Sequence, residues 1–281
     1  GTLSSTERQW LQIEKEVHND SSIYVDEDGL KEEINSWKYP FHFIDFETSA
    51  VALPFNKGTA PYEQIAFQFS HHIYYKDGRI EHATEYINNK AGVFPNFEFI
   101  RALKKALEND NGTILRYSHH ENTILNAIYI QLSTSKEDDR DELIRFIQTI
   151  SHSKSDSSMK WEGNRDMVDL WDVIKKFYYN PLTKGSNSIK AVLPAVLSSS
   201  KYLQQKYSKP INQISVSSRN FSKEHIWLEV ENEIVKSPYK MLPTVFEDWS
   251  DEQIENSLSE IEDIADGGAA LTAYGKLQYT D

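Results

Sequence analysis

The stretch Phe41-His42-Phe43-Ile44-Asp45-Phe46-Glu47-Thr48 is an apolar, aromatic run that contains two carboxylates. Pro40 precedes it and Pro54 follows it, so the pattern predicts a buried β-strand. Side chains alternate between the two faces of a strand, and Asp45 and Glu47 therefore share one face. Two carboxylates buried side by side need a cation or a shared proton, because burying an unpaired charge costs several kcal/mol.

This acid pair has two interpretations. In the first, Asp45 and Glu47 bind a divalent metal ion. In the second, the strand ends at the surface, and both carboxylates face water or pair with Arg or Lys. The spacing of the two residues leaves both interpretations open.

The composition indicates a globular protein and excludes several classes. Of the 281 residues, 39% are hydrophobic and 12% aromatic, which is enough for a large core. The net charge of -13 argues against a protein that coats duplexes or binds anionic membranes. Because there is no Cys, disulfides, thiolate zinc sites and a Cys nucleophile are excluded. The sequence shows no long apolar run and no secretory leader, so we expect a cytoplasmic protein without a membrane partner.

The remaining pattern predicts strands that alternate with helices. Residues 64–75 and 79–87 flank a turn typical of a hairpin, Lys76-Asp77-Gly78, and continue the first strand as an antiparallel meander. A helix at 95–107, a strand at 113–117 and a helix at 121–132 follow. Glu121 thus begins a helix directly behind a strand, at the edge where open α/β sheets place their sites. Residues 167–170 predict another short strand, and 171–179 and 189–197 predict helices.

The predicted domain boundary lies at residue 40. Ser4 and Glu7 form a capping-box pattern at the start of a polar helix. We expect residues 1–39 to be a helical extension or linker and residues 40–281 to be one α/β domain.

Several motifs follow one another in a fixed order. They are Phe43-Ile44-Asp45-Phe46-Glu47-Thr48, Pro61-Tyr62-Glu63-Gln64-Ile65-Ala66-Phe67-Gln68-Phe69-Ser70, Asp169-Leu170, Gly185-Ser186-Asn187-Ser188-Ile189-Lys190-Ala191-Val192-Leu193-Pro194 and Asp266-Gly267-Gly268-Ala269-Ala270. With the order of elements, this set resembles the DEDD exonucleases of the RNase-H-like superfamily. It is most similar to a bacterial family of predicted RNase-H-like nucleases, some of which are attached to a Cas4-like nuclease domain. The resemblance covers about residues 40–275.

The resemblance implies an RNase-H-like α/β fold, with a central mixed sheet of about five strands flanked by helices. It implies that Asp45, Glu47 and Glu121 are catalytic metal ligands for two Mg²⁺ or Mn²⁺ ions in the full-length enzyme. Glu121 matches a family pattern whose middle is altered here. The family's fourth acid has no match in this sequence, so it either lies beyond Asp281 or is replaced by another acid, for which Asp169 and Asp266 are the candidates. A strand-edge hydrogen bond and an Asp-Gly turn are the alternative roles for these two residues.

The function implied by the resemblance is a metal-dependent nuclease, a 3'-5' exonuclease that hydrolyses single-stranded DNA or RNA. The candidate substrate contacts are Phe55 for stacking on a terminal base, His120 near the acids, and Lys190 for a phosphate. The alternatives are a capping or surface histidine and a solvated lysine. Another nuclease domain, Cas4-like, is the implied fused or associated partner.

A second function remains open, namely a catalytically inactive RNase-H-like module that binds nucleic acid or a protein as a scaffold. The missing fourth acid favours this scaffold. The intact pair of Asp45 and Glu47 counts against it.

Overall fold

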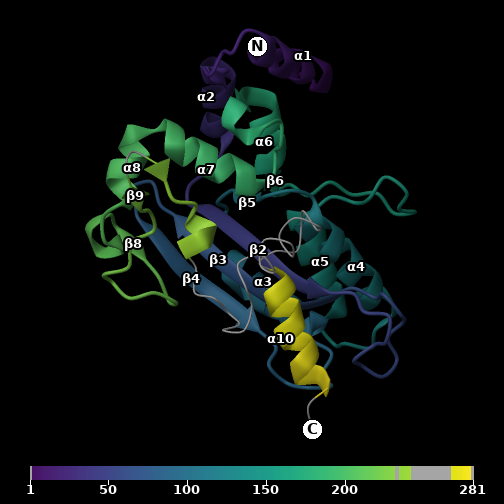
Figure 1. Cartoon of the computed structure of the whole chain (residues 1–281). Coiled ribbons are helices and arrows are strands. Elements are labelled where there is room, and N and C mark those ends of the chain that lie inside the picture. Colours follow the sequence, from purple (N-terminus) through teal and green to yellow (C-terminus); the bar gives the residue numbers. More distant parts are fainter. Residues whose placement is uncertain (1, 232–233, 242–266, 280–281) are drawn as a thin grey trace. The chain divides into compact units, whose positions relative to one another are not determined.

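The computed structural model describes residues 2–231, 234–241 and 267–279 (Figure 1). The chain forms two compact units. Unit 1 comprises Gly1–Phe41, Ile73–His82 and Asp169–Pro243, and unit 2 comprises His42–His72, Ala83–Val168 and Thr244–Asp281. The division differs from the predicted boundary at residue 40, because the N-terminal residues group with Asp169–Pro243 instead of forming an extension.

A six-stranded mixed sheet has the strand order β6-β5-β2-β3-β4-β8. The strands are β2 (Phe41–Ser49), β3 (Ile65–Tyr74), β4 (Ile80–Ile87), β5 (Ile114–Arg116), β6 (Val168–Asp169) and β8 (Val216–Ser217). The sequence run that contains Asp45 and Glu47 therefore forms an interior strand, as predicted. Its pairing with β5 is parallel, through His42 with Ile114 and Phe43 with Leu115. The sequence did not predict β8, which pairs in parallel with β4.

The predicted hairpin joins β3 and β4. In its turn, the backbone N–H of Tyr75 donates to the carbonyl of Arg79, and that of Gly78 donates to the carbonyl of Tyr75, both at 2.9 Å. Gly78 has a φ of 88°, which costs little only for glycine. The turn therefore fixes how the two strands pair.

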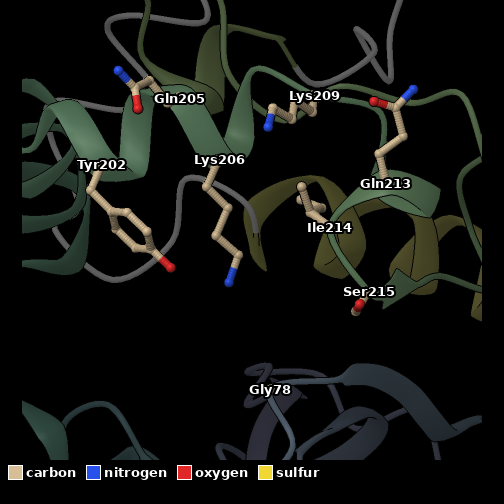
Figure 2. Close-up of a pocket in the computed structure, with 8 residues that line it drawn as sticks. All are labelled: Gly78, Tyr202, Gln205, Lys206, Lys209, Gln213, Ile214 and Ser215. Atoms are coloured by element: carbon tan, nitrogen blue, oxygen red, sulfur yellow. The ribbon is translucent and has the colours of Figure 1, made fainter.

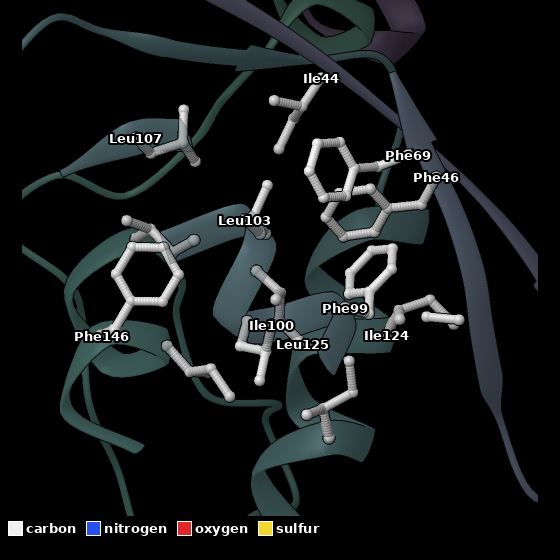
Figure 3. Close-up of a cluster of buried hydrophobic side chains, with 14 of the residues drawn as sticks. Ile44, Phe46, Phe69, Phe99, Ile100, Leu103, Leu107, Ile124, Leu125 and Phe146 are labelled. Atoms are coloured by element: carbon white, nitrogen blue, oxygen red, sulfur yellow. The ribbon is translucent and has the colours of Figure 1, made fainter. Parts of the chain in front are cut away.

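The core of unit 2 lies between the sheet and three helices, α3 (Asn96–Leu107), α4 (His120–Thr134) and α5 (Arg140–Ile150). Figure 3 shows these helices contributing apolar side chains to one cluster with strand residues. Phe99 is fully buried there, and its ring lies edge-on to Phe46 at 4.8 Å and to Phe69 at 5.4 Å between centroids. Ile44 and Phe46 place one face of β2 in this core. The other face of β2 carries Asp45.

A second, smaller cluster in unit 2 includes α10 (Gly267–Tyr279). The ring of Tyr274 stacks on Phe67 with 4.1 Å between centroids. Phe94 and Phe55 pack against this cluster. The helix α10 is thereby held to unit 2 by aromatic contacts.

A chain of buried polar side chains links the middle of the sheet in unit 2. The ring of His42 lies 2.8 Å from Asp110 Oδ1 through Nε2 and 2.9 Å from His71 Nε2 through Nδ1. The other ring nitrogen of His71, Nδ1, lies 2.8 Å from the hydroxyl of Thr84. With Asp110 as a carboxylate, each group has a partner only if both rings are neutral and protonated on Nε2. Both histidines are almost fully buried, so this chain fixes their charge as well as their position.

The elements of unit 1 are mostly short. They are α1 (Ser5–Val17), β1 (Tyr24–Val25), α2 (Glu27–Ser36), α6 (Leu170–Phe177), β7 (Tyr178–Tyr179), α7 (Ile189–Ser199), α8 (Lys201–Tyr207), β9 (Val230–Glu231), β10 (Ile234–Val235) and the 3-10 helices η1 (Pro181–Thr183), η2 (Ile211–Gln213) and η3 (Pro238–Met241). The predicted capping box of Ser4 and Glu7 opens α1. Among the helices described, none is both long and apolar enough to cross a membrane.

Arg8 holds α1 to the later part of unit 1. It is 8% exposed, its guanidinium donates to the carbonyl of Tyr178 and, at 2.6 Å, to Asn187 Oδ1, and it lies 5.1 Å from the ring centre of Tyr179. These contacts explain why the N-terminal residues belong to unit 1.

Replacing Arg8 by Ala is expected to lower the free energy of unfolding of unit 1 by about 2 kcal/mol, because two acceptors lose a charged donor. Hydrogen exchange should show faster exchange in α1 and around Tyr178. The matched control is Gln9→Ala, an exposed position of the same helix. Equal protection in both variants would contradict the anchoring role.

Candidate metal-binding site

The candidate site lies where β2 and β5 end and α4 begins. Because β2 and β5 are parallel, their carboxyl ends meet at the same edge of the sheet. After Arg116 the chain turns through Ser118, whose φ is 77°, and α4 starts at His120. The predicted arrangement of strand, tight turn and helix is therefore confirmed, and it places Glu121 at this edge.

Glu121 is the most unusual side chain of this edge. It is only 3% exposed, and its Oε2 atom has no hydrogen-bond partner among the protein atoms. Burial raises the pKa of Glu121 to about 8, the nearby charge of Asp45 raises it further, and the charge of Arg116 and a hydrogen bond from the backbone of Phe46 oppose the rise. With this pKa, Glu121 is mostly protonated at neutral pH in the folded protein.

Asp45 and Glu47 are less buried than the sequence led us to expect. Asp45 is exposed and Glu47 is half-buried, and Phe43 on the same face is 38% exposed. In its middle the strand is buried on one face only, through Ile44 and Phe46. Of the two interpretations that the sequence left open, the exposure of Asp45 agrees with carboxylates that reach the surface, and the buried acid of this edge is Glu121.

His120 connects the start of α4 to the end of β2. Its Nε2 atom lies 3.1 Å from the hydroxyl of Thr48. With the bond from Phe46 to Glu121, this contact ties the first turn of α4 to the strand that carries Asp45 and Glu47. His120 therefore lies beside the end of β2, and its role in binding substrate stays a prediction.

Sequence reasoning missed one residue at this site and one buried amide in the loop after β2. Arg116, 6% exposed, donates to the carbonyl of Ser118, and its charge reaches Glu121. The sequence signal that could have indicated Arg116 is its position at the end of a short apolar strand. Asn56, in the loop after β2, is 6% exposed, and neither atom of its side-chain amide has a hydrogen-bond partner. No local pattern indicates this buried amide.

The other predicted site residues have different surroundings. Phe55 is half-buried and lies edge-on to Tyr274, with 5.7 Å between ring centroids. Asp169 and Lys190 belong to unit 1. The carboxylate of Asp169 caps α6 by accepting a hydrogen bond from the backbone of Trp171 at 3.0 Å, which is a helix cap and not the strand-edge hydrogen bond given as its alternative role. Lys190 is half-buried in the first turn of α7, and Asp266 lies outside the described residues.

Whether this edge can bind a metal ion depends on the acidic side chains of unit 2. In the parts of the chain that the structure describes, no three His, Asp or Glu side chains are gathered as a metal-binding group. Glu121 and Asp45 are nonetheless close enough to influence each other's charge, and Glu121 Oε2 has no partner. Carboxylate oxygens are the ligands that Mg²⁺ and Mn²⁺ prefer. The donor type and the buried orphan oxygen fit a hard cation, and the three-acid ligand set stays a prediction.

Comparison with known families identifies the domain that contains this site. Residues 42–188, more than half of the chain, match a family described as a domain of unknown function (DUF2779). The chain belongs to this family. The DUF2779 region starts at β2 and includes Asp45, Glu47, Glu121 and Asp169, whereas Lys190 lies just outside it. No curated protein and no solved structure matches the chain.

Proposed function

We propose that this DUF2779 protein is a metal-dependent nuclease with an RNase-H-like fold, acting as a 3'-5' exonuclease on single-stranded DNA or RNA. The observation that carries the proposal is Glu121, a buried carboxylic acid with an unpartnered oxygen beside Asp45. A buried acid whose pKa is raised by burial and by a neighbouring acid is typical of functional sites. Such a group lowers the stability of the folded protein, so stability does not explain its presence.

The fold supports the same proposal. An interior strand carries Asp45 and Glu47, its parallel neighbour β5 leads into α4, and Glu121 stands at the carboxyl ends of both strands. This is the edge at which open α/β sheets bind ligands. The order of these elements agrees with the resemblance to DEDD exonucleases.

In this proposal Asp45, Glu47 and Glu121 would hold Mg²⁺ or Mn²⁺. Bound divalent ions supply an activated water and stabilise the leaving oxygen of a phosphodiester. The exposed side chain of Asp45 can change its rotamer at low cost, whereas the backbone of Phe46 holds Glu121 in place. Arg116, beside Glu121, supplies a positive charge that favours a phosphate at this edge.

The test is digestion of end-labelled single-stranded DNA and RNA by the purified full-length protein with Mg²⁺ or Mn²⁺. We expect shortening from the 3' end, complete loss of activity in EDTA, and loss in the double variant Asp45→Ala with Glu47→Ala. This variant should fold with unchanged or higher stability, because two neighbouring negative charges are removed. The matched control is Asp138→Asn with Glu108→Gln, exposed acids of the same unit. Equal digestion by both double variants would contradict the catalytic assignment.

The scaffold function remains the second candidate, and one observation favours it. Arg116 lies near Glu121 and its positive charge lowers the pKa of Glu121. A side chain of the protein therefore already provides some of the positive charge that a metal ion would provide. A scaffold predicts that Mg²⁺ or Mn²⁺ leaves the thermal unfolding temperature unchanged. A nuclease predicts a rise with metal concentration, which Glu121→Gln should reduce.

A further inference from the structure

Positive charge is concentrated in one part of this acidic chain. Between residues 173 and 223 the sequence contains nine Lys or Arg and no Asp or Glu, although the whole chain has a net charge of -13. All of these residues belong to unit 1. A segment of one sign in a chain of the opposite sign attracts an anionic ligand to a defined place.

A pocket of about 370 Å³ lies within this basic segment (Figure 2). It is lined by residues of α8, η2 and the chain around them, together with Gly78 of the hairpin turn. The pairing of β4 with β8 and a 2.9 Å bond from the backbone of Ile80 to the carbonyl of Ser215 connect the hairpin to this wall. None of the eight lining residues is acidic. The volume is within the range of about 300–1,000 Å³ typical of small-ligand sites.

The lining combines two kinds of groups that bind single-stranded nucleic acid. Lys206 and Lys209 are joined by a bond between the backbone of Lys209 and the carbonyl of Lys206, so both lie at the end of α8. Tyr202, one turn earlier, is 69% exposed, and Figure 2 shows its ring and the ammonium of Lys206 extending into the open space of the pocket. An exposed aromatic ring stacks on an unpaired base, and lysines bind the phosphates beside it.

Gln205 and Gln213 complete the polar lining. Their amides both donate and accept, as the edges of bases require. An acidic peptide would use the lysines equally well, but it offers no flat ring for Tyr202. The combination of ring, amides and lysines therefore favours a nucleotide over a carboxylate ligand.

We infer that this pocket, defined by Tyr202, Gln205, Lys206, Lys209 and Gln213, binds a segment of single-stranded nucleic acid. The inference extends the proposed nuclease function and rests on it for the choice of ligand. The pocket adds a binding site that is separate in sequence from Asp45, Glu47 and Glu121. Its role is to hold the strand, and it contributes no group to the hydrolysis.

The test is fluorescence anisotropy of a labelled oligothymidylate at several salt concentrations, in EDTA so that no cleavage occurs. For Lys206→Ala with Lys209→Ala, we expect the slope of log K against log salt to fall by about 1.4, since each phosphate contact on a single strand contributes about 0.7. Tyr202→Ala should weaken binding roughly tenfold, and Tyr202→Phe should retain it because the ring remains. The matched control is Lys31→Ala with Lys57→Ala, exposed lysines outside the basic segment.

Three results would overturn the inference. They are no binding by the unchanged protein at low salt, equal slopes for the two double-lysine variants, and displacement of the oligonucleotide by polyglutamate as readily as by unlabelled oligonucleotide. Because binding is measured without metal, failure here leaves the digestion test unaffected. Conversely, intact binding with no digestion under any metal would reject the nuclease and leave the pocket as a binding site.

Discussion

Replacing Glu121 by Gln is expected to raise the free energy of unfolding by roughly 4 kcal/mol at pH 8. The pKa of Glu121 is about 8 in the folded protein and 4.5 in the unfolded chain, so the folded state binds the proton more tightly. Stability is therefore full below pH 4.5 and falls by about 1.4 kcal/mol for each pH unit between 4.5 and 8. Gln has nearly the same shape as Glu but cannot ionise, so the loss of stability between pH 4.5 and 8 should be absent in this variant.

The measurement is urea unfolding, followed by circular dichroism, at pH values from 5 to 8. The control Asp138→Asn changes an exposed acid of the same unit to an amide and should leave the curve unchanged. A Gln variant that is less stable than the unchanged protein at pH 8 would mean that Glu121 is held charged by Arg116. Saturating Mg²⁺ should reduce the advantage of Gln if Glu121 is a ligand, because the ion stabilises only the carboxylate.

Lowering the pH below 6.5 is expected to reduce the stability of the folded protein through His42. Burial lowers the pKa of His42 from its ordinary 6.5, against the opposing effect of Asp110. Below pH 6.5 His42 binds a proton more readily in the unfolded chain than in the folded protein, so stability falls as the pH falls. Protonation also places two N–H donors, on His42 and His71, against each other across 2.9 Å.

Replacing His42 by Gln should remove this acid-dependent loss while leaving the dependence caused by Glu121. The matched control is His18→Gln, an exposed histidine at the C-cap of α1. If the loss of stability below pH 6.5 persists in His42→Gln and disappears in His18→Gln, its assignment to His42 is contradicted.

Glu121 and His42 change the free energy of unfolding in opposite directions as the pH rises. Their contributions should therefore appear in different pH ranges of one stability curve. Between about pH 4.5 and 6.5 they oppose each other, and above pH 6.5 only Glu121 contributes. The Gln variant at 121 should therefore be flat above pH 6.5, and the variant at 42 should lose stability steadily from pH 4.5 to 8.

Local patterns in the sequence were sufficient to predict the strands and helices that carry the candidate site. The alternation along Phe41–Ser49 predicted an interior strand, Lys76-Asp77-Gly78 predicted the hairpin, and the turn before Glu121 predicted a helix behind a strand. Each signal spans fewer than about twenty residues and follows from backbone geometry.

Features that depend on distant partners were not predictable in this way. The pairing of His42 with Asp110 joins residues 68 positions apart, and the buried state of Glu121 depends on how β2 and α4 pack. Two-residue strands such as β8 are too short to show any periodicity. The division into two units was also missed, because it depends on where Arg8 finds its acceptors.

The contacts of Arg8 also bear on the order of events during synthesis. Arg8 is made long before its acceptors on Tyr178 and Asn187, which follow 170 and 179 positions later. At roughly 5–20 residues per second, a ribosome needs on the order of 10–30 s to supply them. By then residues 42–168, which hold the core built on β2, α3, α4 and α5, are complete. We therefore expect unit 2 to acquire this core first, before the partners of α1 have been synthesised.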